Sequence, residues 1–255
     1  MPNNIMERQQ HDDRPAGAAI GTFPTTHWSL LAAAGAADSL QARAALAQLC
    51  GSYWYPVYAY VRRAGHDPHN AQDLTQEFFA RLIEKNFVAS TVQEKGRFRS
   101  FLLIAVKRFL VNELERVQAQ KRGGGTQLLS LNAEDAEARY QIEPVDEMSA
   151  DRIYERRWAF ALLDEVMNAL RREYTEDGKD ELFDLLKAFL YGEKSAVSQA
   201  EIGIRFGLSE SAVKSTVHRL RHRYRELLHE AVAQTVVNRV DVEDELRHLL
   251  SVLSG

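Results

Sequence analysis

The chain has 255 residues, a formal net charge of −4 at pH 7, 45% hydrophobic residues and 27% charged residues, a balance that fits a soluble globular protein and excludes a disordered one. No apolar run approaches the roughly 18–20 residues of a membrane span, and the polar N-terminus does not resemble a secretory signal. Cys50 is the only cysteine, which excludes an internal disulfide and a cysteine-based zinc site and fits a cytoplasmic location.

Helical periodicity dominates the sequence and runs of alternating β-branched residues are absent, so we expect an all-α fold. Residues 1–22 show no periodic pattern and are predicted to be a disordered tail. Residues 23–122 are predicted to form a first helical domain, in which Asp38 caps one helix and Gly65 ends the helical pattern that continues past Pro56. Its later helices are expected in "AQDLTQEFFARLIEKN" and "KGRFRSFLLIAVKRFLVNELERVQAQKR".

Residues 123–150 begin with three glycines and continue as an acidic stretch without a sustained period, which predicts a flexible interdomain linker. A phosphate-binding loop is a poor alternative, because no strand precedes the glycines and no Gly-Lys-Ser/Thr follows them. Residues 151–237 are again helical and are predicted to form a second domain. Residues 238–255 form an amphipathic extension, expected to pack on this domain or on a partner, with an apolar stripe of Val242, Leu246, Leu249, Leu250 and Leu253.

The second domain contains the pattern of a helix-turn-helix. Ile202 and Phe206 give a short first helix its buried face, Gly207 suits a left-handed helix terminus, and Ser209 can cap the next helix. This second helix has apolar residues at spacings of four, three, four and three, namely Val213, Val217, Leu220, Tyr224 and Leu227. In such a motif the second helix lies in the major groove of DNA.

The opposite face of this helix is locally basic, with five Lys/Arg and no Asp/Glu from Lys214 to Arg225. Short polar side chains near a helix start can approach base edges, while Lys and Arg contact phosphates. The alternative is a solvated face on a packing helix, but such faces usually mix both signs of charge. His218 and His222 could ligate a metal, yet no Glu or Cys completes a motif, so we expect no metal.

Three segments, in this order, resemble bacterial RNA polymerase sigma factors of the extracytoplasmic-function (group 4) type in the sigma-70 family. "NAQDLTQEFFARL" is similar to the part of sigma region 2 that docks on polymerase, and "FRSFLLIAVKRFLVNELERVQAQKR" to the part that melts and reads the −10 element. "SQAEIGIRFGLSESAVKSTVHRLRHRYREL" is similar to the region 4 helix-turn-helix that reads the −35 element. The resemblance covers about residues 40–122 and 152–230 and implies two helical domains.

The resemblance implies roles for individual residues. Polymerase contact falls to Asp73, Gln76, Glu77 and Phe78, although an ordinary amphipathic helix would look the same. Contact with the −10 element falls to Phe98, Phe101, Lys107, Arg108, Asn112 and Arg116, of which the two phenylalanines could equally be core residues. Contact with the −35 element falls to Ser209, Ser211, Lys214, Ser215, His218, Arg219 and Arg221.

One departure from the family pattern concerns charge. Asn70 and Gln72 are neutral where relatives carry acidic residues, which predicts weaker polymerase binding. Phosphorylation of Thr75 by a Ser/Thr kinase would supply negative charge, because a phosphate adds about −1.5 to −2.

The function implied by the resemblance is that of a promoter-specificity subunit, without catalysis or cofactor, that binds core RNA polymerase and promoter DNA. An anti-sigma factor and a Ser/Thr kinase are candidate regulators. The alternative is a stand-alone helix-turn-helix regulator, which would use the same basic helix but would bind its operator tightly without polymerase.

Overall fold

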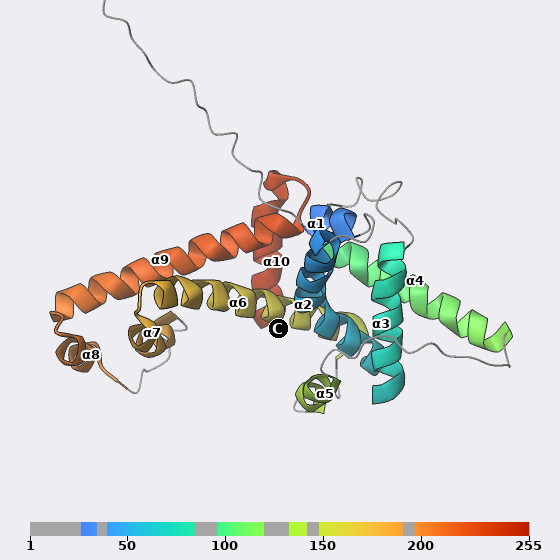
Figure 1. The fold of residues 1–255 in the computed structure, drawn as a ribbon, viewed down its shortest axis with the longest axis horizontal. Coiled ribbons are helices and arrows are strands. Elements are labelled where there is room, and N and C mark those ends of the chain that lie inside the picture. Colours follow the sequence, from blue (N-terminus) through green and yellow to red (C-terminus); the bar gives the residue numbers. More distant parts are fainter. Residues whose placement is uncertain are drawn as a thin grey trace, which may run out of the picture.

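The computed structural model describes residues 27–34, 40–84, 96–119, 133–141, 148–190 and 197–254. Within these ranges the chain forms ten α-helices and two short 3-10 helices, and it contains no β-strand (Figure 1). The all-α prediction is therefore confirmed for this part of the chain. No helix in it is long and apolar enough to span a membrane. The predicted tail at 1–22, the cap at Asp38 and the glycines at 123–125 lie outside the described residues.

The first half of the chain contributes five helices: α1 (His27–Ala34), α2 (Leu40–Arg63), α3 (Pro68–Glu84), α4 (Phe98–Ala119) and α5 (Ala133–Gln141). Helix α2 runs through Pro56 without a break and ends shortly before Gly65, whose φ of 102° suits glycine. Helix α5 lies within the segment predicted as a linker. It is attached to α2 because Glu137 accepts hydrogen bonds from Tyr58 at 2.6 Å and from Arg62 at 2.8 Å.

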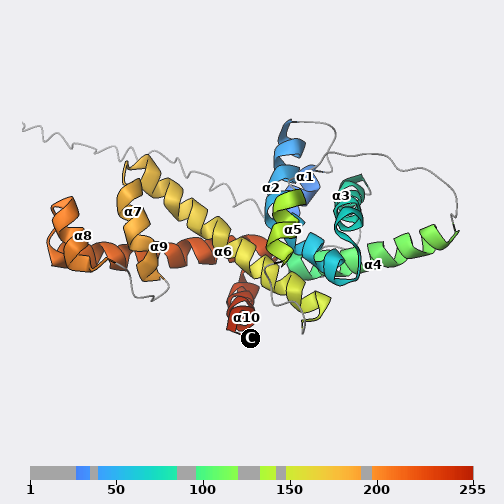
Figure 2. The same ribbon diagram turned by 90° about the horizontal axis from the view of Figure 1, so that it is seen from below.

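The second half contributes the remaining elements: α6 (Ala150–Glu176), α7 (Asp180–Leu186), η1 (Lys187–Leu190), α8 (Gln199–Phe206), α9 (Glu210–Thr235), η2 (Arg239–Asp241) and α10 (Val242–Ser254). The two longest, α6 and α9, pack against each other and connect the two ends of an elongated molecule (Figures 1 and 2). Helix α6 also crosses α2 over an extensive contact.

Two apolar cores lie at opposite ends of the α6–α9 pair. The larger core joins α1–α4 to the N-terminal part of α6, the C-terminal part of α9 and α10, with Tyr53, Phe98 and Trp158 among its fully buried side chains. The smaller core joins the C-terminal end of α6 to α7, α8 and the N-terminal part of α9. The larger core thus includes residues from both sides of the predicted domain boundary at 150, and the division of the chain into two domains stays a prediction.

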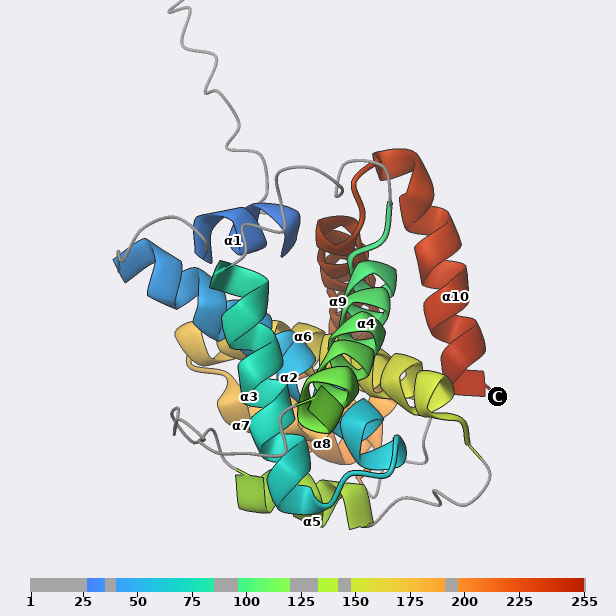
Figure 3. The ribbon, with the colours of Figure 1, turned by 90° about the vertical axis from the view of Figure 1, so that its right-hand side faces the viewer.

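Helix α10 is held in place by a buried ion pair. Arg99, at the start of α4, donates to Glu245 of α10 through Nε at 2.6 Å and through Nη2 at 3.1 Å, and Glu245 is fully buried. Arg97 also approaches Glu245, at 3.3 Å, and Val237 donates its amide hydrogen to Gly96 at 2.9 Å. Helix α10 packs mainly on α6 and α9, and the start of α4 reaches it through Arg99; Figure 3 shows α10 on the side of α4 away from α3. In this structure the C-terminal extension packs on the protein itself, mainly through Val242 and Leu249.

Candidate nucleic-acid interface

The turn between α8 and α9 is fixed by hydrogen bonds that its sequence supplies. Ser198 and Glu201 form a capping box at the start of α8, with bonds of 2.7 and 3.2 Å. Gly207 ends α8 in the left-handed conformation, with φ 65° and ψ 30°, where a Cβ atom would be strained. Ser209 then begins α9 by accepting a hydrogen bond from the amide of Ala212 at 3.2 Å. The conformation of Gly207 and the cap at Ser209 agree with the sequence prediction for the turn, whereas the capping box at Ser198 was not predicted.

Gly203 is a further residue that the turn requires, and sequence reasoning missed it. A Cβ atom at this position would lie 2.6 Å from the carbonyl oxygen of Leu208, closer than side chains are found in proteins. The amide of Leu208 donates to the Gly203 carbonyl at 2.8 Å, so α8 and the turn approach each other through their backbones. The sequence feature that could have indicated it is a glycine inside a short helix, because Gly203 lies four residues before Gly207, the glycine that ends α8.

One face of α9, its inner face, packs in the smaller core, and this packing determines which residues the opposite, outer face presents to solvent. Val213, Val217 and Leu220 are buried and join Ile202 of α8 and Phe183 of α7 in the smaller core. Because a helix packed on one side presents its other side to solvent, the residues between these positions point away from the protein. The apolar residues of α9 that the sequence spacing selected are thus the ones that pack in the smaller core.

The outer face carries the residues that were predicted to read DNA. Ser211, Lys214, Ser215, His218 and Arg219 are all exposed, and the Lys214 side chain is 63% accessible.

Glu210 modifies the charge of this face. Its carboxylate accepts a hydrogen bond from Lys214 at 2.7 Å, which lowers the pKa of Glu210 below its usual value. The carboxylate is therefore ionised at neutral pH and offsets one positive charge near the helix start. Glu210 lies just before the basic stretch from Lys214 to Arg225 that the sequence indicates, so that stretch alone overstates the positive charge at the helix start.

Two of the basic residues of α9 bind the protein itself. Arg221 remains exposed, but its Nε and Nη2 donate to the carbonyl of Phe189 in η1 at 3.1 and 2.7 Å. Arg223 forms a bidentate salt bridge with Glu173 of α6, in which the shortest contact, from Nη2 to Oε1, is 2.7 Å. Both bonds orient α9 on its neighbours. The outward basic surface is accordingly narrower than the sequence indicated.

A second predicted surface lies on α3. Asp73 is exposed and lies 3.2 Å from His69, one helical turn away, and Gln76 is partly exposed. Glu77 pairs with Arg81 of the same helix at 2.5 Å and lies 3.6 Å from Arg116 of α4. Of the predicted polymerase-binding set, Asp73 is therefore exposed, Gln76 and Glu77 are partly exposed, and Glu77 is engaged in ion pairs.

Four of the predicted site residues lie in the core. Phe78, Phe98 and Phe101 are buried, and Phe98 and Phe101 pack against Trp28 with ring centroids 4.8 and 5.1 Å away. Thr75 is fully buried and donates its hydroxyl hydrogen to the Ala71 carbonyl at 2.7 Å. In this structure these side chains pack inside the helical bundle and are not accessible from solvent; their roles in binding stay predictions.

The exposed side of α4 carries the rest of the predicted −10 set. Arg108 and Asn112 are exposed, whereas Lys107 pairs with Asp151 of α6 at 2.5 Å. Arg116 pairs with Glu113 at 2.7 Å.

Two apolar side chains lie next to these polar ones, Val111 and Leu114, and each is 58% exposed. Sequence reasoning missed them. They could have been found from the helical period: with Val106 and Phe109 on the buried face of α4, positions 111 and 114 fall on the solvent-exposed face, where apolar residues are unexpected.

The two histidines considered as metal ligands do not form a site with a third residue. Within the described ranges, no group of three His, Cys, Asp or Glu side chains could hold a metal ion. His222 instead lies 3.3 Å from Glu226, one turn along α9.

Comparison with known proteins gives one match. A family model described as "ECF sigma factor" matches residues 60–230, about two thirds of the chain. The matched span runs from the end of α2 into α9 and includes all three surfaces described above, while α1 and α10 lie outside it. No curated protein and no solved structure matches the chain.

Proposed function

Because the chain belongs to the ECF sigma factor family, whose members act in transcription initiation, we propose that it directs bacterial core RNA polymerase to promoters through separate contacts with two promoter elements. The outer face of α9 reads the −35 element. The exposed side of α4 contacts the −10 element, and α3 binds polymerase. The polymerase supplies the catalysis.

The observation that carries this proposal is the orientation of α9. Its inner face is buried in the smaller core, while Lys214, His218 and Arg219 all point to solvent. A recognition helix needs positive charge only where it meets DNA, because phosphate contacts act over short distances at physiological salt. A protein with a net charge of −4 can therefore bind DNA locally, and its low overall attraction to DNA makes polymerase necessary for tight binding.

The proposed −35 contacts divide by position on α9. Ser211 and Ser215 lie near the helix start, where short side chains can reach base edges. Lys214, His218 and Arg219 are placed for phosphates or for guanine edges. Ser209 and Arg221 support the helix instead, since Ser209 caps it and Arg221 binds the carbonyl of Phe189.

The remaining contacts are proposed for exposed or partly exposed residues only. On α3, Asp73 and Gln76 face a basic surface of polymerase, an arrangement that steers association. On α4, Arg108 and Asn112 contact the −10 element, with Val111 beside them as an apolar contact. Phosphorylation of Thr75 would require α3 to open, because its hydroxyl has no access to solvent.

The experiment that tests this function is run-off transcription from a genomic DNA library with purified core polymerase, with and without the protein. The proposal predicts a defined set of start sites that requires the protein. In parallel, the protein alone is titrated onto the promoters found, at physiological salt. Tight binding without polymerase, together with unchanged transcription, would instead identify a stand-alone regulator.

A further inference from the structure

Helix α10 packs where α4 and α9, the two helices proposed to contact DNA, come together. It contacts α6 and α9, and its Glu245 accepts hydrogen bonds from Arg99 at the start of α4. The N-terminal end of α9 and the C-terminal end of α4 lie toward opposite ends of the molecule (Figure 1). Helix α10 lies outside the residues that the family model matches, so the family assignment does not explain it.

The backbone also joins α4 to α9 directly. Val237, just after α9, donates its amide hydrogen to the carbonyl of Gly96, just before α4, at 2.9 Å. Arg97 and Val236 face each other there as an isolated antiparallel bridge. The start of α4 is therefore fixed to the end of α9, and α10 covers this connection through Glu245.

This connection limits the distance between the two DNA-contacting surfaces. His218 lies 17 residues before the end of α9 (235 − 218), and Asn112 lies 14 residues after the start of α4 (112 − 98). At 1.5 Å per residue these helix segments measure about 26 and about 21 Å, and the connection between the helix ends adds about 12 Å. The backbones of His218 and Asn112 are therefore at most about 60 Å apart.

The two promoter elements are farther apart than this limit. Their names place them about 25 base pairs from each other, which corresponds to about 85 Å along B-form DNA. Bending the DNA enough to close the difference of about 25 Å costs free energy that additional contacts would have to offset. With α4 and α9 joined in this way, the protein cannot place both helices at their elements on a straight promoter. The arrangement in the structure therefore suits the protein before it binds a promoter.

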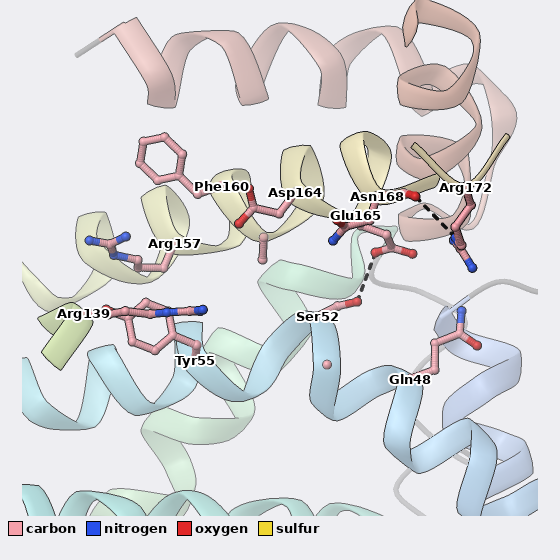
Figure 4. Close-up of a pocket in the computed structure, with 12 residues that line it drawn as sticks. Gln48, Ser52, Tyr55, Arg139, Arg157, Phe160, Asp164, Glu165, Asn168 and Arg172 are labelled. Carbon is pink, nitrogen blue, oxygen red and sulfur yellow. Dashed lines mark hydrogen bonds between the residues drawn. The ribbon is translucent and has the colours of Figure 1, made fainter. Parts of the chain in front are cut away.

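The contact between the first half of the protein, α1–α5, and the second half, α6–α10, includes a loosely packed region. A cavity of about 820 Å³ lies between α2 and α6 (Figure 4), so these helices do not pack at the density of a continuous core. Ser52 of α2 donates to Glu165 of α6 at 3.2 Å across this region. Such a bond adds little net stability, because both groups bond water when the helices part.

The ion pair beneath α10 has a similar property. Arg99 bonds Glu245 of α10 at 2.6 Å and Glu155 of α6 at 2.7 Å. A buried ion pair contributes little net stability relative to apolar packing, because both charges regain their hydration when they are exposed. Breaking it by separating α4 from α6 and α10 therefore costs less than exposing an apolar contact of the same size. While it is formed, it fixes the relative positions of the three helices.

We propose that α10 is an autoinhibitory latch. In the closed arrangement of this structure, α10 and the Arg97–Val236 bridge hold α4 against α9, and the protein cannot contact both promoter elements. Binding to core polymerase breaks the bonds of Arg99 to Glu245 and Glu155, and the two halves separate by at least about 25 Å. This inference rests on the proposed function, because the latch controls the same two DNA-contacting helices.

The test locks the closed arrangement with a disulfide. Because Val237 donates to Gly96, the facing residues Arg97 and Val236 form a pair without mutual hydrogen bonds, in which Cα atoms lie about 4.5 Å apart. Disulfides accept Cα distances of about 4.4–6.8 Å. The double variant Arg97→Cys/Val236→Cys can therefore join α4 to α9 when it is oxidised and release them in dithiothreitol. Burial raises the pKa of the native Cys50 thiol to about 11, so Cys50 should react slowly.

The first readout is run-off transcription by core polymerase from a promoter found in the library, after removal of excess oxidant. The oxidised double variant should initiate at least about tenfold less than the same protein after reduction, because it loses the contacts with one element. Arg97→Cys alone and Val236→Cys alone are the matched controls, and oxidation should not change their activity. Equal initiation by the oxidised and the reduced double variant would overturn the latch.

The second readout does not depend on transcription. The reduced double variant is treated with diamide, either free or bound to core polymerase and promoter DNA, and the disulfide is measured on non-reducing gels. We expect the disulfide in the free protein and its loss in the complex. Equal disulfide formation in both would overturn the latch even if the substitutions impair transcription, and so would its absence from the free protein.

The unsubstituted protein separates this inference from the proposed function. If it gives no protein-dependent start site, the proposed function is wrong. If it initiates normally and the oxidised double variant does so as well, the function stands and the latch is refuted.

Discussion

Replacement of Glu245 by alanine tests the packing of α10 on the rest of the protein. Glu245 is fully buried and bonds Arg99 at 2.6 and 3.1 Å. Removing one partner of a buried ion pair costs about 3–5 kcal/mol, because the other charge stays buried without compensation. Arg99 would keep its bond to Glu155 at 2.7 Å and its position over the Trp158 ring. We therefore expect the lower end of this range, about 3 kcal/mol.

The assay is urea unfolding followed by tryptophan fluorescence. The three tryptophans of the chain, Trp28, Trp54 and Trp158, all belong to the larger core, so their signal reports on the part of the protein that Glu245 holds together. The control is Glu243→Ala, two positions before Glu245 on the exposed face of α10 and 74% exposed, which should change the free energy of unfolding by no more than about 0.5 kcal/mol.

A second substitution checks the reasoning. Arg99→Met combined with Glu245→Met removes both charges, and apolar replacement of a buried ion pair is often neutral. The double variant should therefore recover much of the stability that Glu245→Ala loses. Equal unfolding midpoints for Glu245→Ala and Glu243→Ala would refute the conclusion that this ion pair holds α10.

Three further predictions follow from buried groups. Burial lowers the pKa of His27 from 6.5 to about 4; the unfolded chain then binds the proton more tightly, so His27 should cost about 3 kcal/mol of stability as pH falls from 6.5 to 4, and unfolding curves of His27→Gln should lose less over this interval. Gly203→Ala should destabilise the smaller core by about 1–3 kcal/mol, seen as an earlier loss of helical circular dichroism in urea, and an unchanged midpoint would contradict the backbone approach to Leu208. Thr75→Glu should lower the stability of the larger core without increasing co-purification with core polymerase, because a carboxylate would be buried without a partner; a stable variant that binds polymerase more tightly would show that phosphorylation can act there.

The helix-turn-helix could be predicted from sequence because its determinants are local. Ser198, Gly207 and Ser209 act within a few residues of their own positions, and the apolar spacing of α9 directly gives its buried face. Amphipathic spacing also located α3 and α4. It did not show that Thr75 and Phe98 would be in the core, because a helix pattern alone does not tell which of several apolar or neutral positions other helices will cover.

The contacts that join distant segments could not be predicted. Arg99 and Glu245 are 146 positions apart, and nothing in either neighbourhood indicates the pairing. The same holds for Lys107 with Asp151 and for Arg221 with the backbone of η1. Helix α5 was missed because it is short and acidic, and it is fixed by its bonds to α2 rather than by an apolar stripe of its own.

The measurement that tests the proposed function most directly is transcription by the reconstituted polymerase from a promoter identified in the library, with Arg219→Ala compared with Arg247→Ala. Loss of a single base or phosphate contact costs about 1–3 kcal/mol, so Arg219→Ala should reduce initiation about five- to 150-fold while Arg247→Ala leaves it unchanged. On a template with a substituted −35 element the two variants should become equal. Full initiation by Arg219→Ala on the intact promoter would contradict the placement of α9 in the major groove.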